Sequence, residues 1–138
     1  MAGHMHEGSR IFAMGLALLC LGTSCSTAST VRSGLESGEG VSRIYQEKSY
    51  DQVYSAALRV MNSRRFVLTG ESKDRGLIEG EVPASFSSWG EVVGLKIVQV
   101  APATVKVTAV SRKRSKMQIT GQDWELSLLT GIDTELQH

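Results

Sequence analysis

Two segments with a strict two-residue alternation flank Pro102 in the second half of the chain. In residues 92–100, Val93, Leu95 and Ile97 alternate with Gly94, Lys96 and Val98, and in residues 105–110, Val105, Val107 and Ala109 alternate with Lys106, Thr108 and Val110. A period of two places successive side chains on opposite faces of a strand. The pattern predicts an antiparallel hairpin with one buried face, one wetter face and Pro102 in its turn.

A strand and a helix are predicted earlier in the chain. Residues 42–48 are suited to the strand, and Ser49 with Gln52 three residues later forms a capping-box sequence. Apolar residues then follow at helical spacing: Tyr50, Val53, Tyr54, Ala57, Val60 and Met61. We expect this helix to end near Arg64, where two arginines complement its negative end.

Another hairpin is predicted after this helix. Residues 66–69 and 77–82 read as its two strands, and the polar residues 72–76 between them are typical of a turn. Gly76 is expected at positive φ in that turn, and Pro83 ends the second strand.

The chain ends in a further predicted helix. Thr120 is suited to cap it, with Asp123 at its third position, and residues 117–120 could add a short strand before it. Its apolar stripe consists of Trp124, Leu128, Leu129, Ile132 and Leu136. We expect this stripe to cover the same face of the sheet as the first helix.

Taken in order, these elements predict an α+β two-layer sandwich over residues 41–138. An antiparallel sheet of four to five strands carries two helices packed on one face, in the order β-α-β-β-β-β-α. In layout only, this resembles small domains of the outer-membrane assembly lipoprotein BamC and several uncharacterised families of small envelope lipoproteins. No functional residue follows from that resemblance.

The N-terminal 24 residues have the organisation of a signal peptide. Arg10 precedes an uncharged apolar run of 12 residues, Ile11–Gly22. As a helix this run would span about 18 Å, short of the roughly 30 Å hydrocarbon core of a bilayer. A buried core helix is the alternative, but the run is apolar on every face and continues into a small polar tract. Residues 1–24 are therefore interpreted as an export signal.

The residues that end this segment, Leu21-Gly22-Thr23-Ser24-Cys25, resemble the lipobox of bacterial lipoproteins. The resemblance implies that the thiol of Cys25 receives diacylglycerol and that a signal peptidase cuts before it. It further implies a lipid-anchored protein, and Ser26 is compatible with the outer membrane, facing the periplasm. Gly22 departs from the pattern, because an aliphatic residue is usual there, and secretory cleavage without lipid is the alternative.

The segment after Cys25 is poor in apolar residues. In residues 26–40, ten of fifteen are Ser, Thr, Gly or Ala, without apolar periodicity. We therefore expect residues 25–40 to be a lipid-anchored flexible tether, with a coil reach of roughly 20–25 Å.

The domain lacks the residue sets of common catalytic and metal sites. No cysteine follows Cys25, and His138 is the only histidine after His6. Zinc sites of the Cys/His kind, cysteine nucleophiles and Ser–His–Asp triads thus lack their parts. Glu79 and Glu81 share one strand face and are interpreted as solvated charges. We expect no catalytic residue, no metal and no cofactor.

Two short segments are candidates for contact with a partner. Phe86 and Trp89 lie in a Ser-rich connection and would either contact a protein or cover the sheet edge as satellite core. Arg112, Lys113, Arg114 and Lys116 form the densest charged run, which would either bind an anionic group or be a solvated connection. The chain's net charge of +1 gives no general attraction to nucleic acid.

These observations favour a non-catalytic envelope lipoprotein that binds or scaffolds a partner protein at the membrane. The alternative is a lipid- or small-ligand-binding module, with a pocket between sheet and helices lined by residues such as Tyr54 and Trp124. An enzyme that uses carboxylates alone is the least favoured reading.

Overall fold

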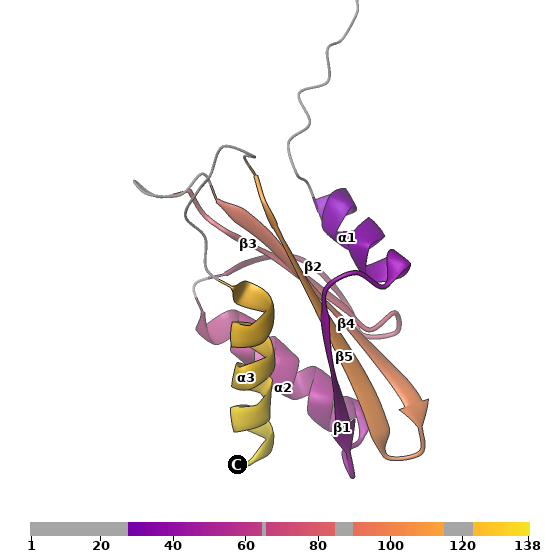
Figure 1. Cartoon of the computed structure of the whole chain (residues 1–138). Helices are drawn as coiled ribbons and strands as arrows, with labels where there is room; N and C mark the ends of the chain where they lie inside the picture. The colour runs from indigo at the N-terminus through magenta and orange to yellow at the C-terminus, as the bar shows by residue number, and fades with distance from the viewer. Residues whose placement is uncertain (1–27, 65, 85–89, 115–122) are drawn as a thin grey trace, which may run out of the picture.

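A computed structural model describes residues 28–64, 66–84, 90–114 and 123–138. Five strands form one antiparallel sheet in the order β1-β5-β4-β3-β2, as Figure 1 shows. The strands are β1 Val41–Gln46, β2 Val67–Ser72, β3 Leu77–Val82, β4 Glu91–Ala101 and β5 Thr104–Lys113. The helices are α1 Ala28–Ser37, α2 Tyr50–Ser63 and α3 Trp124–Leu136. The predicted α+β sandwich with an antiparallel sheet is confirmed.

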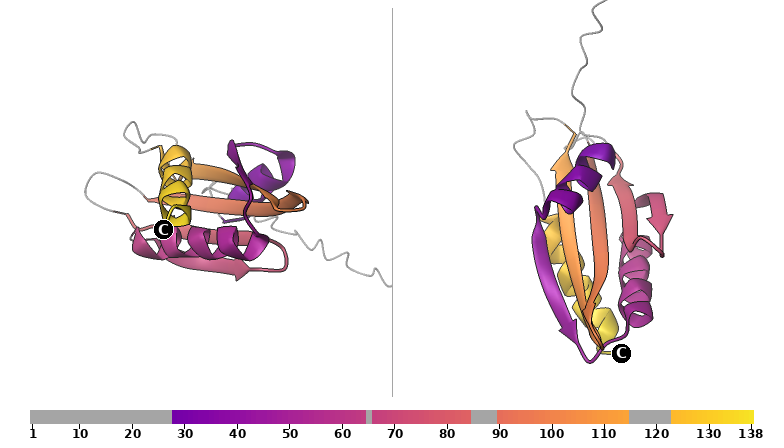
Figure 2. Two further views of the ribbon diagram at one scale, coloured as in Figure 1. Left: turned by 90° about the horizontal axis from the view of Figure 1, so that it is seen from below. Right: turned by 90° about the vertical axis from the view of Figure 1, so that its right-hand side faces the viewer.

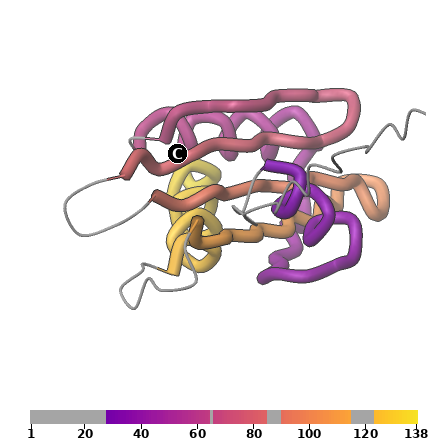
Figure 3. Tube along the Cα trace, turned by 90° about the horizontal axis from the view of Figure 1, so that it is seen from above, coloured from indigo at the N-terminus to yellow at the C-terminus, as the bar shows by residue number. Residues whose placement is uncertain are grey.

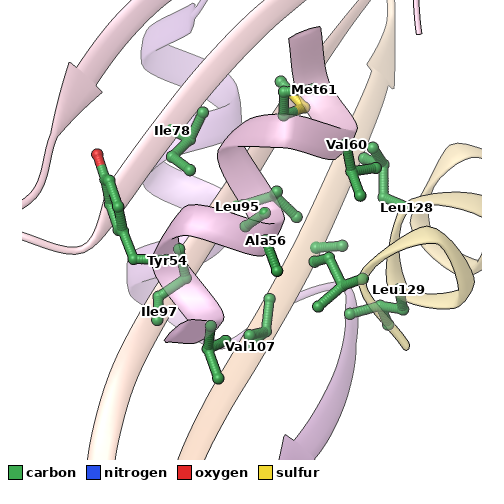
Figure 4. Packing of buried hydrophobic residues seen from close by; sticks show 14 of the residues in the cluster. Tyr54, Ala56, Val60, Met61, Ile78, Leu95, Ile97, Val107, Leu128 and Leu129 are labelled. Atoms are coloured by element: carbon green, nitrogen blue, oxygen red, sulfur yellow. The ribbon is translucent and has the colours of Figure 1, made fainter. Parts of the chain in front are cut away.

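The strand alternation around Pro102 decides which residues enter the core. Leu95 pairs with Ala109 and Ile97 with Val107, and all four side chains are buried beneath α2 and α3. Figure 4 shows Leu95, Ile97 and Val107 beneath the two helices, near Ala56, Val60, Leu128 and Leu129. The predicted stripes of both helices thus cover the same side of the sheet (Figure 2).

Local signals set the ends of α2. The backbone N–H of Gln52 donates to the Ser49 hydroxyl at 3.2 Å, and the Ser49 N–H donates to the Gln52 side-chain oxygen at 2.9 Å. This is the predicted capping box, and the helix ends at Ser63 with Arg64 as its C-cap. The turn between β2 and β3 also has Gly76 at positive φ as predicted.

The start of α3 differs from the prediction. Asp123 is the N-cap, and its carboxylate accepts a hydrogen bond from the N–H of Leu126 at 3.2 Å. A carboxylate caps a helix as well as a threonine hydroxyl does, so the sequence offered two equivalent starting points. Thr120 and the possible strand 117–120 lie outside the described residues.

The segment expected to be a tether contains a folded helix. Helix α1 occupies residues 28–37, and its Val31 and Leu35 are buried. Contacts with β4 and β5 place it on the side of the sheet opposite α2 and α3. The prediction of flexible coil up to residue 40 is therefore wrong for 28–37, and the fold includes this helix upstream of residue 41.

Candidate interaction surface on the α1 side of the sheet

Helix α1 rests on the sheet at a glycine. A Cβ atom on Gly94 would lie 2.5 Å from Cγ1 of Val31 and 3.0 Å from Cδ1 of Leu35, so a larger side chain would push the helix away. The buried residues here form a cluster separate from the main core: Val31, Leu35, Leu77, Val92 and Val110. The contact is small, and it depends on close approach between helix and strand.

An ion pair between Arg32 and Glu79 reinforces this contact. The Arg32 Nε donates to Oε1 of Glu79 at 3.1 Å, and its Nη2 donates to Oε2. Glu79 is only 3% exposed, whereas Arg32 is 40% exposed. The hydrogen bond and the negative charge of Glu79 raise the pKa of Arg32.

The interpretation of Glu79 as a solvated strand charge is therefore wrong. The carboxylate is covered by α1, a helix that the sequence reading did not anticipate. Glu81, two residues further along β3, is half-exposed and pairs with Arg114.

The part of this side that α1 does not cover carries exposed aliphatic residues. Ile44 on β1 and Val98 on β4 both pair with Lys106 on β5, so the three form one row across the sheet. Ile44 is 58% exposed and Val98 41%. Val100, two residues further along β4 at an irregularity in the β4–β5 pairing, is 51% exposed. We call Ile44, Val98 and Val100 the aliphatic strip.

A cleft of about 730 Å³ lies between the end of α1, the first turn of α2 and the β2–β3 turn. Both of its lysines are engaged: Lys73 forms an ion pair with Asp51 at 2.9 Å, and Lys96 donates to the Arg75 carbonyl oxygen at 2.7 Å. The Tyr50 hydroxyl donates to the Lys73 carbonyl oxygen, and burial raises the pKa of Tyr50. With both signs of charge balanced, the cleft does not indicate one class of ligand.

The basic segment at the end of β5 is partly neutralised. Arg112 forms an ion pair with Glu39 and Arg114 with Glu81. Lys113 is exposed, and Lys116 lies outside the described residues. An anionic contact for the four residues stays a prediction.

Three other predicted positions also fall outside the described residues: Cys25 with the rest of its lipobox-like sequence, Phe86 and Trp89. The structure adds Val31, Arg32 and Glu79 to the candidate residues; their only signal in the sequence is the four-residue spacing of Val31 and Leu35.

Tyr54 and Trp124, the residues suggested for a ligand pocket, belong to core packing. Tyr54 is 3% exposed and stacks on Tyr50, with ring centroids 6.0 Å apart. Burial, and then the nearby Glu71 carboxylate, raise the pKa of Tyr54 to about 12. Trp124 lies edge-on to Phe66, with centroids 5.0 Å apart. Tyr54 is thus a core residue, and Trp124 is partly buried at the edge of the core.

The described ranges contain no group of three or more His, Cys, Asp or Glu side chains placed to hold a metal ion. Among the helices in the described part of the chain, none is both long and apolar enough to cross a bilayer.

Comparison with known proteins gives distant structural likenesses. No protein-family model matches the sequence, and no curated protein matches it. Two solved structures of the adenylate sensor from AMP-activated protein kinase, one with a ribofuranotide (ZMP) and one with ATP, share 13% and 14% identity with TM-scores of 0.48 and 0.47. They cover 71% and 72% of this chain, and 94% and 96% of their own.

A DUF4468 family protein from Bacteroides ovatus shares 15% identity with a TM-score of 0.31, over 69% of this chain and 78% of its own. Likenesses at these levels indicate neither a ligand nor a partner for this protein.

Proposed function

We propose that the protein is an envelope lipoprotein, anchored through lipid on Cys25, whose domain binds a partner protein without catalysis. The observation that carries the binding role is the aliphatic strip. Helices α2 and α3 cover their side of the sheet, whereas α1 leaves Ile44, Val98 and Val100 exposed. Aliphatic side chains grouped on a rigid strand surface are suited to the desolvated centre of an interface.

The attachment rests on the lipobox-like sequence before Cys25. One acyl chain gives only marginal membrane binding, whereas two or more give stable anchoring. The proposed location is the outer membrane, with the domain in the periplasm. The partner would then be another envelope protein, because nucleic acid is absent from that compartment.

Mass spectrometry of the purified protein from membranes tests the attachment. We expect an N-terminal peptide that begins at Cys25 and carries the mass of acyl chains. The Cys25→Ser variant should lose this modification and leave the membrane fraction. An intact, unmodified peptide spanning Leu21 to Ser26 in the native protein would contradict the proposal.

Crosslinking in native membranes tests the binding role. The double variant Ile44→Glu/Val98→Glu should lose most of the crosslinked partner, roughly tenfold or more for an interface centre. The matched control is Val67→Glu, because Val67 is a comparable aliphatic residue, 56% exposed, on the opposite edge strand β2. Circular dichroism must show that both variants are folded. Equal recovery from the two variants would rule out the strip as the contact.

A further inference from the structure

We infer that the domain is held in one orientation, with the end of the sheet where α1 begins placed against the lipid headgroups of the bilayer that carries the Cys25 lipid. The inference rests on the proposed attachment at Cys25. It follows from the replacement of the expected tether by a docked helix.

The chain between the lipid and the folded domain is very short. Only residues 26 and 27 separate Cys25 from Ala28, the first residue of α1. Three residue steps span at most about 11 Å when fully extended. A 15-residue coil up to residue 40 would have allowed roughly twice that reach and free rotation of the domain.

In its docked state helix α1 is not part of the tether, because its first turns pack on the sheet. Val31 is fully buried against Gly94, and Arg32 holds Glu79 through two hydrogen bonds. At the other end of the helix, the N–H of Glu39 donates to the Gly34 carbonyl oxygen at 2.9 Å, and Glu39 pairs with Arg112 of β5. The position of the sheet is therefore tied to the position of Cys25 through only a few residues.

The start of α1 lies at one end of the sheet. Strand β3 ends there, β4 begins there and β5 ends there, since Glu91 pairs with both Val82 and Lys113. Figure 3 views the molecule from this end. The described surface residues here include Pro83, Ala84 and Lys113, all exposed. This is the surface that the short link places next to the headgroups.

The opposite end of the sheet is far from the lipid. The turn between β4 and β5, at Pro102 and Ala103, is ten residues from Lys113, or roughly 30 Å along a strand. Lys106, in the row with Ile44 and Val98, is seven residues away, or roughly 23 Å. The aliphatic strip would therefore stand clear of the headgroups, accessible to a partner.

The basis of this orientation is the short link rather than charge. Arg112 and Arg114 near this end are paired with Glu39 and Glu81, and the exposed Lys113 adds one positive charge. The geometry therefore needs no anionic lipid, and the headgroup layer of a zwitterionic membrane is sufficient.

Fluorescence quenching in vesicles tests the orientation. Acylated full-length protein is bound to phosphatidylcholine vesicles with a quencher on the headgroup, after labelling of a single introduced thiol, Lys113→Cys or Ala103→Cys. Both sites are exposed and lie at opposite ends of β5. We expect the label at 113 to be quenched several-fold more strongly than the label at 103.

A flexible spacer of about ten Gly and Ser residues between Thr27 and Ala28 serves as the control, because it leaves the fold intact and restores a tether. It should bring the two labels close to equal quenching. Equal quenching without the spacer would overturn the inference, and so would a difference that appears only when anionic lipid is added. Failure of the attachment itself is distinct, because the protein would then not pellet with the vesicles.

Discussion

The two sides of the sheet are built on different scales. Among the described residues, 18 buried ones form one continuous cluster beneath α2 and α3, and both helices have side-chain N-caps. Beneath α1, the same part of the chain provides five buried residues around Gly94 and the partly exposed Arg32–Glu79 ion pair. The first side carries most of the free energy of folding, because buried apolar area dominates that term. The second side fixes the position of a single ten-residue helix.

This difference indicates that α1 can leave the sheet while the rest of the domain stays folded. An isolated helix of ten residues is marginal in water, so its order depends on the docking contact. Local opening with a free energy below that of global unfolding is the expected behaviour of such an element. Four experiments probe the contrast.

The largest effect is expected from truncating matched leucines on the two sides. Leu95→Ala removes a fully buried core side chain and should lower the free energy of unfolding by about 3 kcal/mol. Leu35→Ala should cost only about 1 kcal/mol, because α1 can undock before the sheet unfolds. Urea denaturation followed by circular dichroism measures both. Equal losses would mean that the two clusters unfold as one unit.

Alkaline pH should act on the core side. The folded protein raises the pKa of Tyr54 from 10.0 to about 12, so its proton is held more tightly in the folded state than in the unfolded one. The stabilisation is complete below pH 10 and is lost as the pH rises from 10 to about 12, by roughly 2 kcal/mol. Urea denaturation across this window gives the slope, and Tyr54→Phe should reduce it. An unchanged slope in the variant would assign the pH dependence to other groups.

Gly94→Val should detach α1 selectively. The added side chain would occupy the space of Val31 and Leu35, at a cost of roughly 1–2 kcal/mol. Hydrogen exchange should accelerate for the amides of residues 32–37 and stay slow in α2. Val98→Ala, on the same strand and the same side but beyond α1, is the control and should leave both helices protected. Faster exchange throughout α2 would show that the sheet itself is disturbed.

The smallest effect concerns the α2 cap. Ser49→Ala removes the hydroxyl that accepts from the Gln52 N–H, whereas the Ser49 backbone N–H can still donate to the Gln52 side chain; it should cost about 1 kcal/mol in thermal or urea denaturation. Ser55→Ala, on the exposed face of the same helix, should be neutral or slightly stabilising because alanine favours helix. Similar losses from both variants would contradict the capping role.

The elements on the α2 and α3 side of the sheet could be predicted from the sequence, because the residues that determine them are close together in the chain. The Ser49–Gln52 capping box, the alternation of Val93, Leu95 and Ile97, and the turn at Gly76 each lie within a few residues, and all were confirmed. The start of α3 was misplaced, since Thr120 and Asp123 both satisfy the local rule for a cap.

The α1 side could not be predicted in the same way because its determinants are distant in sequence. Arg32 and Glu79 are 47 residues apart, and Val31 gains its burial from Gly94. Within residues 26–40 the abundance of Ser and Gly outweighs one apolar pair, so local rules favour coil. The fold brought the partners together, and tertiary contacts overrode propensity.

Because α1 is far in sequence from the strands that it contacts, it can dock only late in synthesis. During synthesis the N-terminal part of the chain emerges first, whereas Val92 and Val110, which bury Val31 and Leu35, emerge much later. Until β4 and β5 have paired, residues 28–37 have nothing to dock on and a helix of this length does not persist. If Cys25 is acylated as proposed, the modifying enzyme would meet the chain before residues 28–37 dock, and pairing of β4 with β5 would end that period.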